Sequence, residues 1–193
     1  MRDVVLIVMD RPPSNYFDFF GLPHNLNIDA KDLEARFYSL SRKFHPDLFA
    51  RRPAEERQYS LDATAILNDG YRVLKDPVLR AEYILTAHGF PIGEQKSSNV
   101  PPELLEEVFE LNMALEEIRG GDESVRPQLA EARQKFLAMR DESDGELSAQ
   151  FSSYDGNKDH AALEQIRSIL NKRRYIRNLI GEVEKERAGK ETQ

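Results

Sequence analysis

The 193-residue sequence contains no cysteine. Without cysteine the chain cannot form disulfide bonds, use a thiolate as a nucleophile, or bind zinc or an iron–sulfur cluster through sulfur ligands of its own. Its four histidines, at positions 24, 45, 88 and 160, are scattered and lack the spacing of a metal-binding pair. The sequence therefore predicts no metal site and no cofactor.

Long hydrophobic runs and an excess of positive charge are also missing. The longest apolar run near the start, residues 4–9 (VVLIVM), is too short for a membrane span or for the apolar part of a signal peptide. Lysine and arginine number 27 against 34 aspartates and glutamates, a formal net charge of −7, whereas nucleic acids are bound by basic surfaces. We therefore expect a soluble cytoplasmic protein whose main partner is neither a membrane nor a nucleic acid.

Apolar residues recur with helical spacing along most of the chain, and almost no segment alternates with the period of two that is typical of strands. A helix that Asp29 caps carries its apolar residues at steps of four, three and four: Leu33, Phe37, Leu40 and Phe44. A second long helix is expected at about residues 54–75. Asp76-Pro77 then begins another, which ends before Gly89. The sequence predicts an all-α fold.

Composition changes along the chain and indicates two units. Residues 30–52 carry six basic and three acidic side chains, whereas residues 101–147 carry five basic and thirteen acidic ones. Between them, residues 89–100 are rich in turn-forming and polar residues and are expected to be a linker. We expect an N-terminal extension over 1–14 (a short strand or disordered), a helical domain over 15–88, a three-helix domain over 101–187, and a tail over 188–193.

The C-terminal domain is expected to contain three helices. The first begins at Pro101-Pro102 and ends at Gly120-Gly121. The second begins near Asp122 and reaches about residue 154, unless Asp144-Gly145 breaks it. The third covers about residues 159–187. Its basic cluster, residues 172–174 (KRR), is expected to lie on a solvated face or to pair with the acidic first helix.

The tripeptide His45-Pro46-Asp47 lies between two long helices and is therefore expected at the tip of a helical hairpin. Proline stiffens the tip, while the imidazole and the carboxylate can form hydrogen bonds. Taken alone, the tripeptide is as well explained by a solvated turn. The helix before it has a basic flank: Arg36, Arg42 and Lys43.

The helix after Pro101 has more apolar residues than a three-helix bundle must bury. One stripe, at steps of four, three, four and three, is complete by itself: Leu104, Val108, Leu111, Leu115 and Ile118. A second stripe lies roughly 100–180° further round the helix, and we call it the outer strip: Leu105, Phe109 and Met113. Glutamates border it: Glu106, Glu110 and Glu117. Such a strip is typical of a docking surface for a partner protein, although a wide buried face would produce the same pattern. The glutamates at 103, 107 and 110 are not expected to be catalytic, because nothing in the sequence suggests a cleft.

Three segments resemble the J-domain family in order and spacing. They are residues 16–22 (YFDFFGL), 41–47 (SRKFHPD) and 66–77 (ILNDGYRVLKDP). The continuation at residues 79–85 (LRAEYIL), closed by residues 88–90 (HGF), is similar to one branch of that family, the HscB co-chaperones of iron–sulfur cluster assembly. The resemblance to a J-domain covers about residues 15–88. The resemblance of residues 101–187 to the HscB C-terminal domain is looser.

The resemblance implies a co-chaperone without enzymatic activity. It implies that the hairpin tip and basic flank bind a DnaK/HscA-type chaperone ATPase and stimulate ATP hydrolysis there, through His45, Pro46, Asp47, Arg36, Arg42 and Lys43. It further implies that the C-terminal domain binds the scaffold protein IscU through the outer strip and its rim: Leu105, Phe109, Glu110, Met113 and Glu117. In this family an aromatic residue at the position of Tyr175 takes part in the same contact.

Two departures from the family pattern and two alternatives accompany this interpretation. Glu34 and Ser39 stand where many J-domains are basic, and Glu106 replaces a frequently apolar residue. The first alternative is a general J-domain co-chaperone with a different client. The second, a hydrolase that uses His45 and Asp47, is disfavoured because a convex tip cannot exclude water from a substrate.

Overall fold

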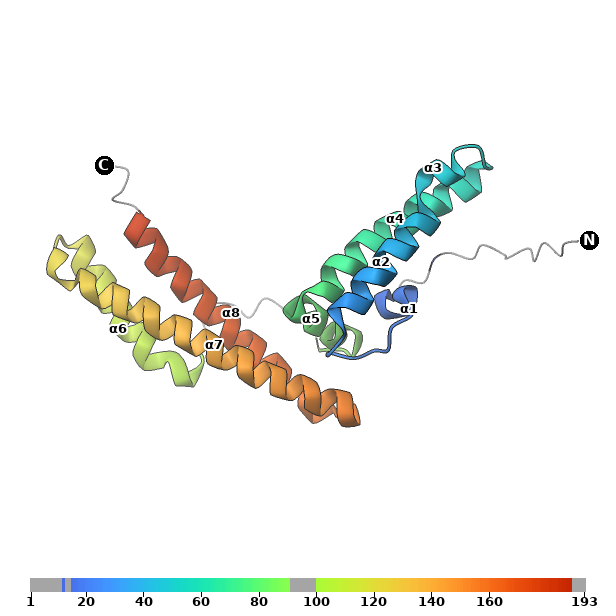
Figure 1. The fold of residues 1–193 in the computed structure, drawn as a ribbon. Helices are drawn as coiled ribbons and strands as arrows, with labels where there is room; N and C mark the ends of the chain where they lie inside the picture. The colour runs from blue at the N-terminus through green and yellow to red at the C-terminus, as the bar shows by residue number, and fades with distance from the viewer. Residues whose placement is uncertain (1–11, 13–14, 91–99, 189–193) are drawn as a thin grey trace, which may run out of the picture. The chain divides into compact units, whose positions relative to one another are not determined.

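The computed structural model describes residue 12, residues 15–90 and residues 100–188. The expected N-terminal extension (1–14), linker (89–100) and tail (188–193) lie almost entirely outside the described residues, so the predictions for them remain predictions. Across the described ranges every regular element is a helix, which confirms the all-α prediction. The chain divides into two compact units, residues 1–88 and residues 89–193 (Figure 1).

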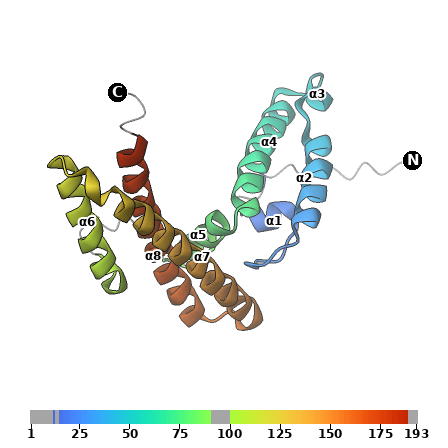
Figure 2. The same ribbon diagram turned by 60° about the vertical axis from the view of Figure 1, so that its left-hand side comes forward.

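The first unit contains α1 (Tyr16–Phe20), α2 (Ala30–Phe44), α3 (Pro46–Phe49), α4 (Ala54–Lys75) and α5 (Pro77–Ala87). Figures 1 and 2 show α2 and α4 side by side, joined at one end through α3. The predicted caps are confirmed, since Asp29 accepts hydrogen bonds from the first turn of α2 and Asp76 from the first turn of α5. The sequence did not predict α3. It forms because Pro46 cannot continue α2 but fits the first position of a new helix.

Aromatic and leucine side chains fill the core of this unit, among them Phe17, Phe20, Leu33, Leu67 and Leu74, each at most 2% exposed. The helices α1 and α4 approach closely at Gly70. A Cβ atom at this position would lie 3.0 Å from ring atoms of both Tyr16 and Phe20. A side chain at this position would therefore force these two rings to move by a few tenths of an ångström, although the Gly70 backbone is ordinary helix.

The second unit contains η1 (Pro102–Leu104), α6 (Leu105–Arg119), η2 (Glu123–Val125), α7 (Arg126–Asn157) and α8 (His160–Ala188). The long helices α7 and α8 form an antiparallel pair, and the shorter α6 packs against the N-terminal part of α7 (Figures 1 and 2). Residues from all three helices form one apolar core, which includes Leu111, Leu129, Phe136, Ile176 and Val183. The described helices include none that is long and apolar enough to cross a membrane.

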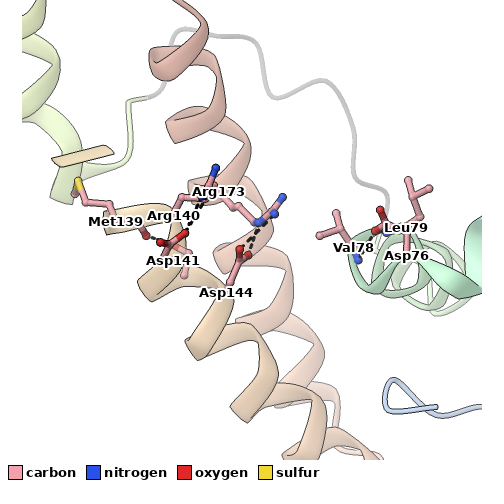
Figure 3. A network of polar contacts seen from close by, with 9 residues as sticks. Asp76, Val78, Leu79, Met139, Arg140, Asp141, Asp144 and Arg173 are labelled. Atoms are coloured by element: carbon pink, nitrogen blue, oxygen red, sulfur yellow. Dashed lines mark hydrogen bonds and ion pairs between the residues drawn. The ribbon is translucent and has the colours of Figure 1, made fainter. Parts of the chain in front are cut away.

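The helix α7 continues through Asp144 and Gly145, where the sequence left a break open. An exposed glycine inside a helix costs about 1 kcal/mol relative to alanine, and burial of Leu147 and Phe151, which follow within the next two turns, offsets that cost. Asp144 also accepts a hydrogen bond of 2.5 Å from Arg173 of α8 (Figure 3).

Two cations of the basic cluster at residues 172–174 pair with α7. Arg173 binds Asp144, and the Lys172 ammonium lies 3.8 Å from a Glu146 carboxylate oxygen. Neither expectation for the cluster, a solvated face or pairing with α6, holds for these two residues, which are largely buried against α7. The physical reason is proximity, because α8 packs along α7 over most of its length.

Candidate functional site

The His-Pro-Asp tip lies at the junction of α2 and α3: His45 separates the two helices, and Pro46 and Asp47 begin α3. The side chain of His45 is 55% exposed and that of Asp47 is 90% exposed. The Asp47 backbone N–H donates a hydrogen bond of 3.3 Å to Nδ1 of His45. A neutral imidazole that accepts at Nδ1 carries its proton on Nε2. The tip therefore offers a donor on the opposite side of the imidazole ring and a solvated carboxylate to a partner.

The backbone just before the tip is anchored to α4. Phe44 is buried, and its ring lies 5.7 Å from that of Phe19 and 6.0 Å from that of Tyr59, measured between ring centroids. Its carbonyl accepts hydrogen bonds from the hydroxyls of Ser60, at 2.7 Å, and Thr64, at 3.2 Å. Sequence reasoning missed both hydroxyls, because they lie inside α4 and cap a different helix.

The three cations of the predicted basic flank differ in their surroundings. Arg42 and Lys43 are exposed. Arg36 is half-buried, and its Nε donates to both carboxylate oxygens of Asp32 at 3.0 Å. Its Nη1 donates to the carbonyls of Phe20, at 3.1 Å, and Gly21, at 2.8 Å. Arg36 therefore joins the end of α1 to α2. The exposed positive charges of the flank are those of Arg42 and Lys43.

Large apolar side chains are also exposed on this unit, and the sequence did not single them out. They are Tyr38, Leu48 and Leu61, which are 54%, 63% and 52% exposed. Leu48 follows the tip directly and lies in α3. It adds apolar surface next to the hydrogen-bonding groups of His45 and Asp47.

The outer strip of the second unit faces solvent. Leu105, Phe109 and Met113 are 56%, 65% and 47% exposed, whereas Leu111 and Leu115 on the same helix are 1% and 4% exposed. The prediction that α6 has a buried stripe and a separate exposed strip is confirmed. The strip is not needed to fill the core.

A groove of about 520 Å³ lies between α6 and α7, next to the strip. Nothing in the sequence indicates this groove, and the expectation that the glutamates are not catalytic stays a prediction. Met113 and the predicted rim residues Glu110 and Glu117 line the groove. The Lys135 ammonium from α7 lies 3.3 Å from a Glu107 carboxylate oxygen and 3.8 Å from one of Glu110. Lys135 and the glutamates of the lining thus extend the surface of the strip onto α7, which the sequence could not reveal because it does not show which helix faces α6.

Tyr175 occupies a different environment from the outer strip. It lies in α8, is half-buried, and packs against the core that α6, α7 and α8 share. Burial raises the pKa of its phenol, and the Glu182 carboxylate raises it further. The structure thus brings the three strip residues together and places two predicted glutamates in the adjoining groove, while Tyr175 packs on the core. Within the described ranges, no group of three or more potential metal ligands is present.

Comparison with known proteins covers both units. A family model described as the HSCB C-terminal oligomerisation domain matches residues 100–184. The chain is 33% identical over 171 residues to a co-chaperone protein HscB homolog of Aliivibrio salmonicida, a match that covers 89% of this chain and 95% of the relative. This chain belongs to the HscB co-chaperone family. An HscB homolog of Shewanella loihica is 30% identical over 171 residues, which cover 89% of this chain and 96% of that relative.

Solved HscB structures share the fold. The chaperone HscB from Vibrio cholerae matches with a TM-score of 0.63 and 29% identity, covering 91% of this chain and 98% of that one. The human co-chaperone protein HscB matches with a TM-score of 0.68 and 26% identity, covering 92% and 84%. The HscB matches thus extend over both the J-domain and the C-terminal helices.

Proposed function

We propose that this HscB family member is a cytoplasmic J-type co-chaperone of iron–sulfur cluster assembly. In this proposal the J-domain tip stimulates the ATPase of a dedicated DnaK/HscA-type chaperone, and the C-terminal unit delivers an IscU-type scaffold protein to it. The chain has no catalytic step of its own. The observation that supports the proposal is that each unit has its own exposed surface feature, the His-Pro-Asp tip on one and the apolar outer strip on the other.

The tip has the properties of a ligand for another protein. It is convex, its hydrogen-bonding groups are exposed, and its backbone is held to α4. The neighbouring cations Arg42 and Lys43 are exposed and would meet an acidic patch on the ATPase. Charges at the rim of an interface act mainly on the rate of encounter and make it dependent on salt.

The outer strip and the groove beside it have the properties of a client surface. Phe109 is the largest exposed apolar side chain of α6, and aromatic anchors often dominate binding energy. Glutamates line the groove next to it, so a client that presents an apolar patch with basic neighbours fits this surface.

A different client is the alternative that an experiment must separate. The tip would serve a general J-domain co-chaperone equally well, so only the outer strip distinguishes the two proposals. A hydrolase based on His45 and Asp47 is not supported, because both side chains project from a convex tip into water.

The test measures steady-state ATP hydrolysis by a purified DnaK/HscA-type chaperone with increasing amounts of this chain, with and without an IscU-type scaffold. We expect stimulation by the wild type, a further increase with the scaffold, and loss of both with His45→Gln. This exposed residue should contribute less than about 0.5 kcal/mol to stability, so the melting temperature of the variant serves as the folding control. Stimulation by the variant at the wild-type level would contradict the role of the tip, and stimulation that the scaffold does not alter would favour a different client.

A further inference from the structure

The carbonyl of Phe44 is the last one before the His-Pro-Asp tip, and two hydroxyls of another helix bind it. The last carbonyls of a helix have no partner within that helix. At the end of α2 the proline at position 46 removes a further backbone donor. The Ser60 hydroxyl, fully buried, donates to the Phe44 carbonyl at 2.7 Å, and the Thr64 hydroxyl donates to it at 3.2 Å.

These two bonds act on the peptide group that leads into His45. A peptide group is planar, so holding the Phe44 oxygen also orients the His45 nitrogen. The backbone of His45 turns out of the helix there, with φ −57° and ψ 127°. Ser60 and Thr64 are four residues apart, so both hydroxyls project from one face of α4. These two hydrogen bonds therefore set the direction in which the chain leaves α2 and enters the tip.

The hydrogen bonds within the tip are local, and the His45 carbonyl accepts one of 3.0 Å from the Leu48 N–H of α3. His45 and Asp47 are exposed, and the bond between the Asp47 N–H and His45 Nδ1 is long, at 3.3 Å. The Phe44 carbonyl is the group next to the tip that hydrogen bonds join to α4. If both hydroxyls are removed, the Phe44 carbonyl stays buried without a donor, which is unfavourable, and the end of α2 must shift toward water.

We propose that Ser60 and Thr64 are positioning residues for the ATPase contact, and that they hold the His-Pro-Asp tip in its docking conformation without touching the chaperone. This inference rests on the proposed function. A tip that adopts the competent conformation for only a tenth of the time would bind about tenfold more weakly. The half-maximal concentration for ATPase stimulation should therefore rise about tenfold when both hydroxyls are removed.

The experiment uses substitutions that separate the hydroxyl from the volume of the side chain. Thr64→Val removes the hydroxyl and keeps the shape, while Thr64→Ser keeps the hydroxyl and removes a methyl group. We expect Thr64→Val, alone and with Ser60→Ala, to raise the half-maximal concentration, and Thr64→Ser to restore the wild-type curve. Thr86→Val and Ser143→Ala are matched controls, because each removes a hydroxyl that donates at 2.8 Å to a carbonyl of its own helix, outside α4.

A second measurement keeps the inference separate from the proposed function. Amide chemical shifts of His45 and Asp47 report the tip conformation without any partner, and they should change in Thr64→Val but not in Thr64→Ser or Thr86→Val. If the wild type fails to stimulate any DnaK/HscA-type ATPase, the proposed function is wrong, and the amide shifts still decide the inference. A wild-type stimulation curve or unaltered amide shifts in folded Thr64→Val would overturn it. If the double variant does not fold, the single variants are sufficient.

Discussion

Replacing Phe109 by alanine tests the proposal that Phe109 is a docking residue, with the buried Leu111 of the same helix as the comparison. Phe109 is 65% exposed, so its truncation creates no cavity and should change the free energy of unfolding by no more than about 0.5 kcal/mol. Leu111, two residues later, is 1% exposed, and truncation of a buried leucine to alanine costs about 2–5 kcal/mol. In a domain of about 100 residues, each kcal/mol lowers the melting temperature by about 4–8 °C. Leu111→Ala should therefore lower Tm by about 10 °C or more, and Phe109→Ala by a few degrees at most.

Binding to the scaffold should follow the opposite order. As an aromatic anchor in the centre of the outer strip, Phe109 should contribute about 2 kcal/mol to binding, which corresponds to a thirtyfold increase in Kd when it is removed. Leu111 is only 1% exposed and offers a partner almost no surface, so Leu111→Ala should keep its affinity at temperatures where it is folded. Calorimetric titration with an IscU-type scaffold and thermal melts of the same samples measure both quantities. A loss of stability in Phe109→Ala as large as that in Leu111→Ala, or an unchanged Kd, would refute the assignment of the strip as a client surface.

Three further substitutions test other parts of the structure. Arg42→Glu combined with Lys43→Glu should slow association with the chaperone ATPase and weaken its dependence on salt; a stopped-flow salt series with unchanged rates would contradict this. Gly145→Ala should raise the free energy of unfolding by about 0.5–1 kcal/mol, measured in urea, because the added methyl group meets no atom within 4 Å. Gly70→Ala should lower it by about 1–3 kcal/mol, because its Cβ would lie 3.0 Å from the Tyr16 ring; an unchanged Tm would show that α1 moves aside at little cost.

Features that depend on local chemistry were accessible from the sequence. Aspartates at positions 29 and 76 were recognised as caps because a short acidic side chain binds the free N–H groups of a first turn, and the structure shows those bonds. The exposure of Phe109 was predicted in the same way. The spacing of α6 already provides a full buried stripe, which favours an exposed outer strip, and the exposure of Phe109 in the structure excludes the alternative of one wide buried face.

Features that depend on which helices pack against each other could not be predicted from the sequence. In the sequence Arg36 is one more cation on an amphipathic helix. Only the structure shows that it binds carbonyls at the end of α1. In the sequence Ser60 and Thr64 are ordinary helical residues. Only the structure shows that their hydroxyls bind the carbonyl at the end of α2. The groove beside the outer strip likewise needs Lys135 of α7 opposite α6. In each case a side chain contacts a group that is distant in the sequence. The spacing of apolar residues within one helix does not predict which other helix it contacts.

The division of α6 into a buried face and an exposed apolar face limits how this helix can change during evolution. Under the proposed function, substitutions on the buried face should reduce the amount of folded protein and substitutions on the outer strip should reduce partner binding, so we expect selection against both kinds for different reasons. Polar exposed positions such as Asn112 and Glu116 are left with the greatest freedom to vary. A mutational scan that scores abundance and partner binding separately should therefore resolve α6 into three longitudinal bands: one that lowers abundance, one that lowers binding alone, and one that tolerates most residues.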